Sequence, residues 1–341
     1  ENESVKKLVD DIRKRVEIEI YYEYGFSSRV GRSLEKSSAS TIAPNIDIFE
    51  SVTDNIYERV INEVGQIRNL PKDEIKKIIY GIILKLKNSG AIYKDALREY
   101  IYNEGNSYMI SKKRYNWMPG MSIVRKPQFI NTINSSKKSN DYDVINSKSW
   151  YYKWLEKSIR RAFKELKLET PILRLDTPYD IYNIIFKELE SNEISFKLET
   201  KKKNKMIGLN DTAINITNDT EQLKCSHCGH TISTSKKYSK YSIGMSCMRN
   251  ECIGSYEFFK DDLDFYGKLY TNGDICRIYA KEHTGLLERD DRESVENEFK
   301  KAKENQKPWD TNILSCTPTL EMGIDIGDLS TVVLCSVQPG Q

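Results

Sequence analysis

Four cysteines stand in two pairs at a spacing typical of metal sites. Two residues separate Cys225 from Cys228, four separate Cys247 from Cys252, and eighteen lie between the pairs. Glycines near both pairs permit the tight turns that let two thiolates point at one ion. We therefore predict a structural, four-coordinate Zn²⁺ site, in which no position is left for a catalytic water.

The chain around these cysteines, residues 221–256, has the pattern of a zinc ribbon with too little core of its own, so the metal would hold it together. From Lys224 to Arg249 there are five basic residues and no acidic residue. This composition suits contact with a nucleic-acid backbone, and a solvated hairpin tip would look the same. Two histidines are rival metal ligands, His227 and His230.

A second candidate site lies in a loop between two apolar runs, residues 312–316 and 331–337. Both runs have the length of buried strands, and the second is rich in β-branched residues. Gly323 allows close backbone approach in the loop, and Asp325 can accept hydrogen bonds. Open α/β sheets bind ligands beyond the carboxyl ends of their strands, so we predict a ligand-binding loop here.

The loop sequence at 317–325, Thr-Pro-Thr-Leu-Glu-Met-Gly-Ile-Asp, resembles motif V of superfamily 2 helicases, whose core pattern is Thr-(five residues)-Gly-Ile-Asp. Residues 277–285 and 292–299 look like that superfamily's strand, His-containing turn and Arg-to-Phe helix. Together with Gly-Arg-Ser-Leu-Glu-Lys at 31–36, the best match is the large DEAD/DEAH-type helicases with a zinc-containing insertion. The alternative is an ordinary strand-loop-strand of an unrelated α/β domain.

This resemblance implies roles for four residues of the loop. Thr317 and Gly323 would face nucleic acid, and Asp325 would approach the ATP ribose. On the same resemblance we also assign Gly323 to the nucleotide site and Thr319 to the nucleic-acid surface. ATP and Mg²⁺ are expected as ligands of the full-length parent protein.

Several motifs of a complete motor do not occur in the sequence. No Gly-x-x-x-x-Gly-Lys-Ser/Thr phosphate loop is present, and the family's Gln-x-x-Arg-x-Gly-Arg motif is missing. Residues 73–76, Asp-Glu-Ile-Lys, open a polar-faced helix and so do not form a Walker-B pair. We expect a segment of a larger protein that does not hydrolyse ATP alone and whose partner is the missing first RecA-like lobe of the same polypeptide.

Composition restricts the setting in which the chain works. The 341 residues include 53 basic and 50 acidic side chains, for a net charge of +3, so attraction to nucleic acid must come from local patches. The apolar runs are far shorter than the ~20 residues of a membrane helix. Three further cysteines are isolated in strand-like runs, which does not resemble a disulfide framework. We expect a cytoplasmic protein with no membrane contact.

One basic helix is predicted over residues 150–168, inside the most basic stretch of the chain. Between Arg125 and Lys167 there are eleven basic and four acidic residues. Such a face attracts phosphates, and this attraction weakens as salt rises. The alternative is an ordinary lysine-rich surface. We assign nucleic-acid binding to four residues on the predicted exposed side of this helix, Lys153, Lys157, Arg160 and Arg161.

Periodicity and turn residues divide the chain into modules. These are an N-terminal helix and basic linker (1–50), a winged-helix-like module (51–125), a flexible connector (126–149), a helix-plus-strand module (150–205), the zinc ribbon (221–256) and a truncated second RecA-like lobe (263–341). The winged-helix prediction depends on a strand at residues 108–110.

We predict a mixed α/β, multi-module fold that belongs to an ATP-dependent nucleic-acid helicase or translocase. It would supply nucleic-acid contacts, to DNA more than to RNA, and the motif V part of the ATP site. The alternative is a non-enzymatic, zinc-containing module that binds DNA or docks a partner. A phosphate-loop motif in the adjacent coding sequence would distinguish the two.

Overall fold

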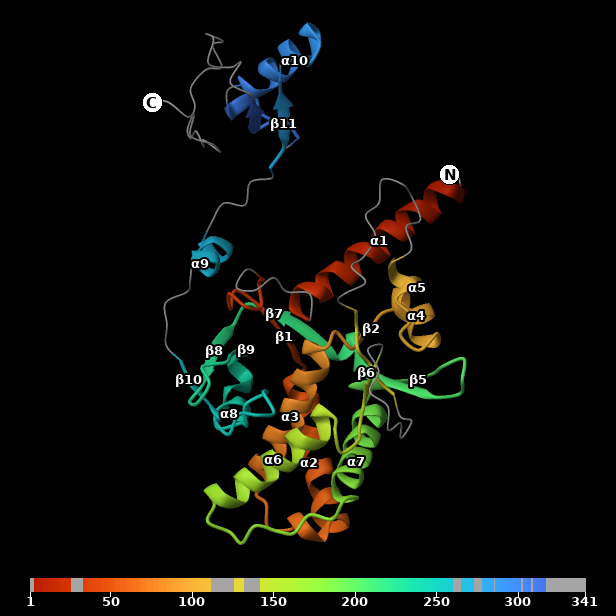
Figure 1. Ribbon diagram of the computed structural model, residues 1–341, viewed down its shortest axis with the longest axis vertical. Coiled ribbons are helices and arrows are strands. Elements are labelled where there is room, and N and C mark those ends of the chain that lie inside the picture. The colour runs from red at the N-terminus through yellow and green to blue at the C-terminus, as the bar shows by residue number, and fades with distance from the viewer. Residues whose placement is uncertain are drawn as a thin grey trace. The chain divides into compact units, whose positions relative to one another are not determined.

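The computed structural model describes residues 3–25, 33–111, 126–131, 142–259, 265–272, 278–284, 286–301, 303–307 and 309–316. The chain divides into two units, Glu1–Asn272 and Gly273–Gln341. Both units contain helices and strands, so the fold is mixed α/β, with several separate sheets (Figure 1).

Four helices form the centre of the first unit: α2 (Ile46–Glu63), α3 (Lys72–Asn88), α6 (Trp150–Glu165) and α7 (Thr177–Ser191). Helix α2 packs against α3 and α7, and α3 packs against α6, as Figure 1 shows. Apolar residues of α3 recur every three or four positions and are buried, as the sequence pattern predicts. Gly90, with φ 67°, follows the end of α3 as expected.

A five-stranded sheet lies beside these helices. Its strands pair in the order β2 (Ile92–Tyr93), β6 (Lys205–Asn210), β3 (Ile130–Asn131) and β4 (Asp143–Val144), and β5 (Ser195–Glu199) also pairs with β6. Strand β6 is parallel to β2 and antiparallel to β3 and β5. Strand β5 lies within residues 150–205, where the sequence predicts helix and strand.

The four paired cysteines lie in a separate antiparallel sheet, which we call the cysteine ribbon (residues 220–258). Its strands are β10 (Tyr256–Phe258), β8 (Thr220–Cys225) and β9 (Thr231–Ser235), in that order. Helix α8 (Ser239–Ser242) follows β9 and packs against α3. The ribbon therefore rests on the central helices instead of standing alone.

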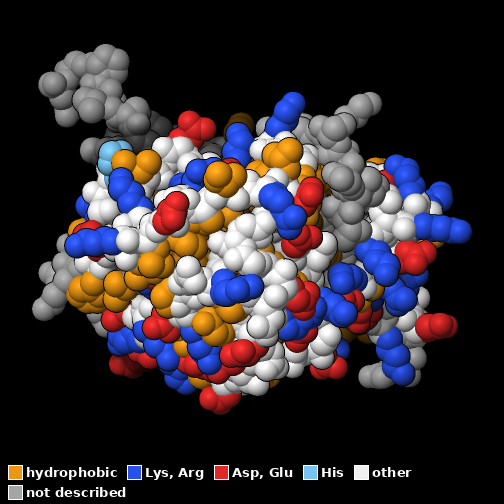
Figure 2. Space-filling model, turned by 90° about the horizontal axis from the view of Figure 1, so that it is seen from below, with side chains coloured by type: hydrophobic (Ala, Val, Ile, Leu, Met, Phe, Trp, Pro, Cys, Tyr) orange, Lys and Arg blue, Asp and Glu red, His pale blue; other side chains and the backbone are white. Residues whose placement is uncertain are grey.

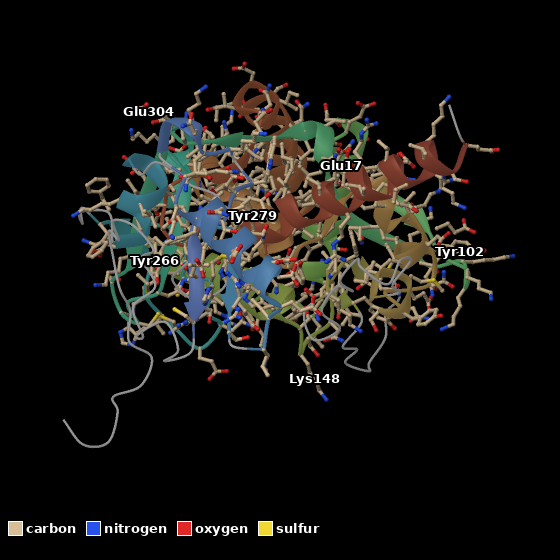
Figure 3. All side chains as sticks on the ribbon, turned by 90° about the horizontal axis from the view of Figure 1, so that it is seen from above. Glu17, Tyr102, Lys148, Tyr266, Tyr279 and Glu304 are labelled. Atoms are coloured by element: carbon tan, nitrogen blue, oxygen red, sulfur yellow. The ribbon has the colours of Figure 1, made fainter. Side chains whose placement is uncertain are left out.

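An N-terminal helix and several short elements are also described in the first unit. Helix α1 (Glu3–Tyr24) forms as predicted, and β1 (Thr41–Pro44) pairs with β7 (Ile214–Thr217). The remaining elements of this unit are α4 (Arg98–Tyr102), α5 (Tyr108–Ser111), α9 (Phe265–Asn272) and four 3₁₀ turns, at Gly65–Ile67, Asp95–Leu97, Asp211–Ala213 and Lys236–Tyr238. Tyr102, at the end of α4, is exposed and lies at the outer edge of the molecule (Figure 3).

Two local predictions were wrong. Residues 108–110 belong to helix α5 instead of a strand, and β2 pairs with β6, more than one hundred residues later. The helix-and-hairpin outline of a winged helix is therefore not formed by the described residues 51–111. Composition predicts a solvated linker at residues 27–36, but in its described part, residues 33–36, Ser33 and Glu35 are buried.

One hydrophobic core runs through most of the first unit. Buried residues from Tyr24 to Tyr256 belong to a single contiguous cluster, which includes the centres of α2, α3, α6 and α7. The segments predicted at 51–125 and 150–205 thus pack on one another. Lysine, arginine and acidic side chains are interspersed on the face in Figure 2, with apolar side chains among them.

The second unit contains a strand-helix-strand arrangement. Strand β11 (Ala280–His283) is parallel to β12 (Ile313–Cys316), and α10 (Arg289–Phe299) and a 3₁₀ turn (Lys303–Asn305) lie between them in sequence. Parallel strands need such a crossover, usually a helix. His283 pairs in register with Cys316 and contacts Glu296 of α10 at 2.7 Å, which fixes the helix beside the strand.

Among the residues that the structure describes, no helix is both long enough and apolar enough to cross a membrane.

Close packing of α3 and α6 predicts the effect of one substitution. A Cβ atom added at Gly81 would lie 2.2 Å from Cη2 of Trp154. Overpacking costs about 1–3 kcal/mol, and the better helix propensity of alanine offsets about 1 kcal/mol. We expect Gly81→Ala to lower the free energy of unfolding, measured by chemical denaturation. Gly65→Ala is the control, because its nearest neighbour is the end of the Arg68 side chain at 4.0 Å.

A charged network joins α2, α3 and α8 and predicts a pH dependence of stability. Glu50 accepts hydrogen bonds from Lys240 at 2.6 Å and Lys76 at 3.1 Å, and from Tyr241. Hydrogen bonds from Lys240 and Tyr241 lower the pKa of Glu50 from 4.5 to about 2. Because the folded pKa is the lower one, the stabilisation is complete above pH 4.5 and is lost as pH falls toward 2.

We therefore expect Glu50→Gln to lower the melting temperature at neutral pH and to flatten its decline between pH 4.5 and about 2. Glu58→Gln, on the exposed side of the same helix, should leave both unchanged. An identical pH profile for wild type and Glu50→Gln would contradict the role of this network.

Candidate metal centre

The four cysteine thiols converge at one end of the cysteine ribbon. Cys225 ends β8, Cys228 lies in the turn that follows, and Cys247 and Cys252 lie between α8 and β10. All four Sγ atoms lie within 4.8 Å of one another. The Cys225–Cys252 and Cys228–Cys247 pairs are each separated by 3.6 Å, and all four cysteines are free thiols.

These distances match the size of a metal site. Zinc–sulfur bonds are about 2.3 Å long, so a tetrahedron of thiolates around zinc has edges of about 3.8 Å. Backbone N–H groups also point at the sulfurs: that of Arg249 is 3.5 Å from Cys247 Sγ, and that of Gly254 is 3.4 Å from Cys252 Sγ. Such hydrogen bonds favour the thiolate form. The cluster could therefore hold a metal ion such as zinc.

Two glycines make this convergence possible. Gly229, which follows Cys228, has φ 67°, a left-handed conformation that lets the first turn close. A Cβ atom added at Gly254 would lie 2.7 Å from Cys225 Sγ and also 2.7 Å from the Cβ atom of His227. Any larger residue at Gly254 would push the two turns apart.

Neither rival histidine belongs to the thiol cluster. His230 Nδ1 lies 2.7 Å from the hydroxyl of Tyr256, and burial lowers the pKa of His230 to about 4, so its imidazole is neutral at physiological pH. The group of converging metal-ligand atoms among the described residues contains cysteines alone at this site. His227 and His230 therefore lie outside the group of converging ligand atoms.

The thiols differ in their electrostatic surroundings. Burial raises the pKa of Cys247 to about 12. For Cys228 burial also acts to raise the pKa, but hydrogen bonds from the backbone of His230 and from the other thiols outweigh it, and the pKa is lowered to about 7. A bound divalent ion would have to displace protons from thiols such as that of Cys247, so its affinity would depend on pH.

Side chains of helix α6 donate hydrogen bonds to residues 244–252, the loop that carries Cys247 and Cys252. We call this loop the knuckle loop. The indole N–H of Trp150 donates to the carbonyl of Met248 at 2.7 Å, and that of Trp154 donates to the carbonyl of Cys247 at 3.0 Å. Two turns further along α6 from Trp154, Arg161 donates to the carbonyl of Gly244.

Lys157 makes the most contacts with the knuckle loop. Its ammonium donates to the carbonyls of Cys247 at 2.8 Å, Arg249 at 2.7 Å and Cys252 at 3.1 Å. Burial lowers the pKa of Lys157, and the nearby cysteines act in the opposite direction by favouring its charged form. All three donors of the ammonium are thus used by backbone oxygens of the knuckle loop.

These contacts separate the four basic residues predicted on the exposed side of α6. Lys153 and Arg160 are exposed, and Arg160 pairs with Glu156 at 2.7 Å. Lys157 and Arg161 are only partly exposed and face the knuckle loop instead. The role of the inward-facing side chains was missed, although positions 150, 154, 157 and 161 have the spacing of one helix face.

The other predicted site residues, Thr317, Thr319, Gly323 and Asp325, lie outside the described residues. Strand β12 ends at Cys316, immediately before this loop in sequence, and His283 is its partner on β11. Cys316, the last described residue before them, lies at the carboxyl end of a strand in a parallel pair, the edge at which α/β sheets bind ligands.

Comparisons with known proteins give a limited result. No protein-family model matches the chain, and no solved structure matches it significantly. The chain is 39% identical over 80 residues to Druantia protein DruE of Escherichia coli (strain UMEA 4076-1). This match covers 21% of the chain and 4% of that protein, so the similarity concerns one short stretch of a much longer relative.

Proposed function

We propose that Cys225, Cys228, Cys247 and Cys252 bind one structural Zn²⁺ ion. The proposal is supported by four free thiols within 4.8 Å of one another and by the thiol separations of 3.6 Å. When bound, the ion would crosslink the two turns of a ribbon whose own core is small. The chain would supply four thiolates as ligands. Backbone N–H groups and helix α6 would hold these thiolates in place.

We expect one zinc per chain in protein purified without added metal, measured by elemental analysis. Cys228→Ser should reduce the zinc content strongly, whereas Cys316→Ser should leave it unchanged, because Cys316 is an exposed thiol outside the cluster. Zinc affinity should fall as pH falls, because protons compete for the thiolates. Zinc content near zero in wild type, or undiminished in Cys228→Ser, would refute the site.

We propose further that the chain belongs to an ATP-dependent nucleic-acid helicase or translocase. The observation that carries this proposal is the motif V-like sequence at 317–325, directly after β12 of a parallel strand-helix-strand unit. In the parent protein the missing lobe would supply the phosphate loop and the carboxylates for Mg²⁺. Asp325 and Gly323 would close over the nucleotide, and Thr317 and Thr319 would contact the strand.

The exposed side of α6 is the best candidate in the first unit for nucleic-acid contact. Lys153, Arg160 and Lys164 are exposed there, and Lys148, just before the helix, projects outward in Figure 3. Lys153 stands one turn before Lys157, so the same helix presents cations outward while it holds the knuckle loop inward. Such a surface would contact phosphates without sequence preference.

Replacing the two outward cations tests this surface. Affinity for single-stranded DNA should fall as the salt concentration rises. The slope of log affinity against log salt is negative, and each neutralised phosphate adds ~0.7 to the magnitude of that slope. We expect Lys153→Gln with Arg160→Gln to reduce that slope by up to about 1.4. The control is Lys187→Gln with Lys203→Gln, which removes two exposed lysines away from α6. An unchanged slope in the α6 variant would exclude this surface.

A further inference from the structure

Lys157 of helix α6 has an unusual set of hydrogen-bond partners for a lysine that is partly exposed. Its ammonium is held by three backbone carbonyls, two of which belong to the cysteines Cys247 and Cys252 themselves. The third belongs to Arg249, whose N–H donates to Cys247 Sγ. One cation therefore fixes both ends and the middle of the turn that carries the second thiol pair.

The charge of Lys157 lacks an acidic partner in the described part of the chain. Arg161, the other cation of α6 that contacts the knuckle loop, lies 3.3 Å from Glu165, and Arg160 pairs with Glu156. No described carboxylate forms a salt bridge with Lys157, and its ammonium contacts the backbone carbonyls of Cys247 and Cys252 instead. Thiolates bound to a metal ion would place negative charge beside this ammonium.

A divalent ion with four thiolates carries a net charge of about −2. Placing that charge in a partly buried ribbon is unfavourable unless donors and cations surround it. Trp150 and Trp154 donate neutral N–H groups to the same loop, which orders it without changing its charge. Lys157 adds a full positive charge that neighbours the sulfur cluster through the backbones of two ligands.

We propose that Lys157 is a positioning residue of the metal centre: it holds Cys247 and Cys252 at ligand spacing and its ammonium balances the charge of the metal-bound thiolates. The inference rests on the proposed zinc site and deepens it. It assigns Lys157 to the metal centre instead of to nucleic-acid binding, and it makes α6 part of the outer coordination sphere of the metal. Partners of this kind typically alter metal affinity by about 10- to 100-fold.

Three variants separate charge from hydrogen bonding. Lys157→Gln keeps N–H donors but removes the charge, Lys157→Arg keeps both, and Lys153→Gln removes a lysine one turn away that faces solvent. Zinc dissociation constants are measured on the full chain by competition with a chromophoric chelator, and Co²⁺ absorption reports the tetrahedral thiolate site. We expect the dissociation constant to rise about 10- to 100-fold in Lys157→Gln and to change little in the other two.

A second measurement excludes a purely structural role. The melting temperature of each variant is compared with and without zinc. A side chain that only packs the fold lowers both values equally, whereas loss of metal affinity narrows the difference between them. The zinc-dependent rise should therefore shrink in Lys157→Gln and persist in Lys157→Arg and Lys153→Gln.

The outcomes distinguish this inference from the zinc proposal. If wild type binds neither zinc nor Co²⁺, the metal site itself is refuted. If wild type binds metal and Lys157→Gln binds it equally tightly, Lys157 has no role at the metal centre. If Lys157→Arg folds and loses as much affinity as Lys157→Gln, the charge is not what matters and the balancing role is overturned.

Discussion

The need to pair backbone carbonyls in a tight loop governs the arrangement of the first unit. A turn that brings two cysteines toward one point directs its carbonyl oxygens outward, and buried carbonyls without partners are costly. In this chain α6 supplies the donors, from Trp150, Trp154, Lys157 and Arg161. The cysteine ribbon has little core of its own, so this contact holds it against the helical body.

The same helix must then pack against the body as well. Gly81 of α3 lets the indole ring of Trp154 approach the backbone, and the ring stacks on that of Trp150, with centroids 5.1 Å apart. Glu50 of α2 adds a second connection to the ribbon, through Lys240 and Tyr241 of α8. Core packing, ribbon docking and thiol convergence are therefore linked through α3 and α6, and a change in one affects the others.

The second unit is small and exposes apolar side chains. Ile278 before β11 and Ile313 in β12 are both exposed, and the sheet formed by the described residues of this unit has two strands and therefore two edges. Exposed edges and apolar side chains are features that proteins usually cover. These features are what a lobe that packs against further strands would present, and they support the proposal that this unit functions as part of a larger protein.

Local pattern was sufficient for part of this description. The spacing of the four cysteines predicted a common site, and apolar periodicity predicted α1, α3 and the strand at 195–199, because turn geometry and helical repeat are properties of neighbouring residues. Residues 108–110 were misread as a strand, because three apolar residues carry no reliable period and Asn106 accepts a hydrogen bond from the backbone N–H of Tyr108 at the start of the turn.

Only the tertiary structure shows which cations of α6 face solvent and which contact the knuckle loop. Lys153, Lys157, Arg160 and Arg161 look equivalent in sequence, as cations close together on one helix. Which of them faces solvent depends on the knuckle loop, about ninety residues further along the chain, whose carbonyls select Lys157 and Arg161. Sequence determined that these side chains are charged, and long-range packing determined what each charge contacts.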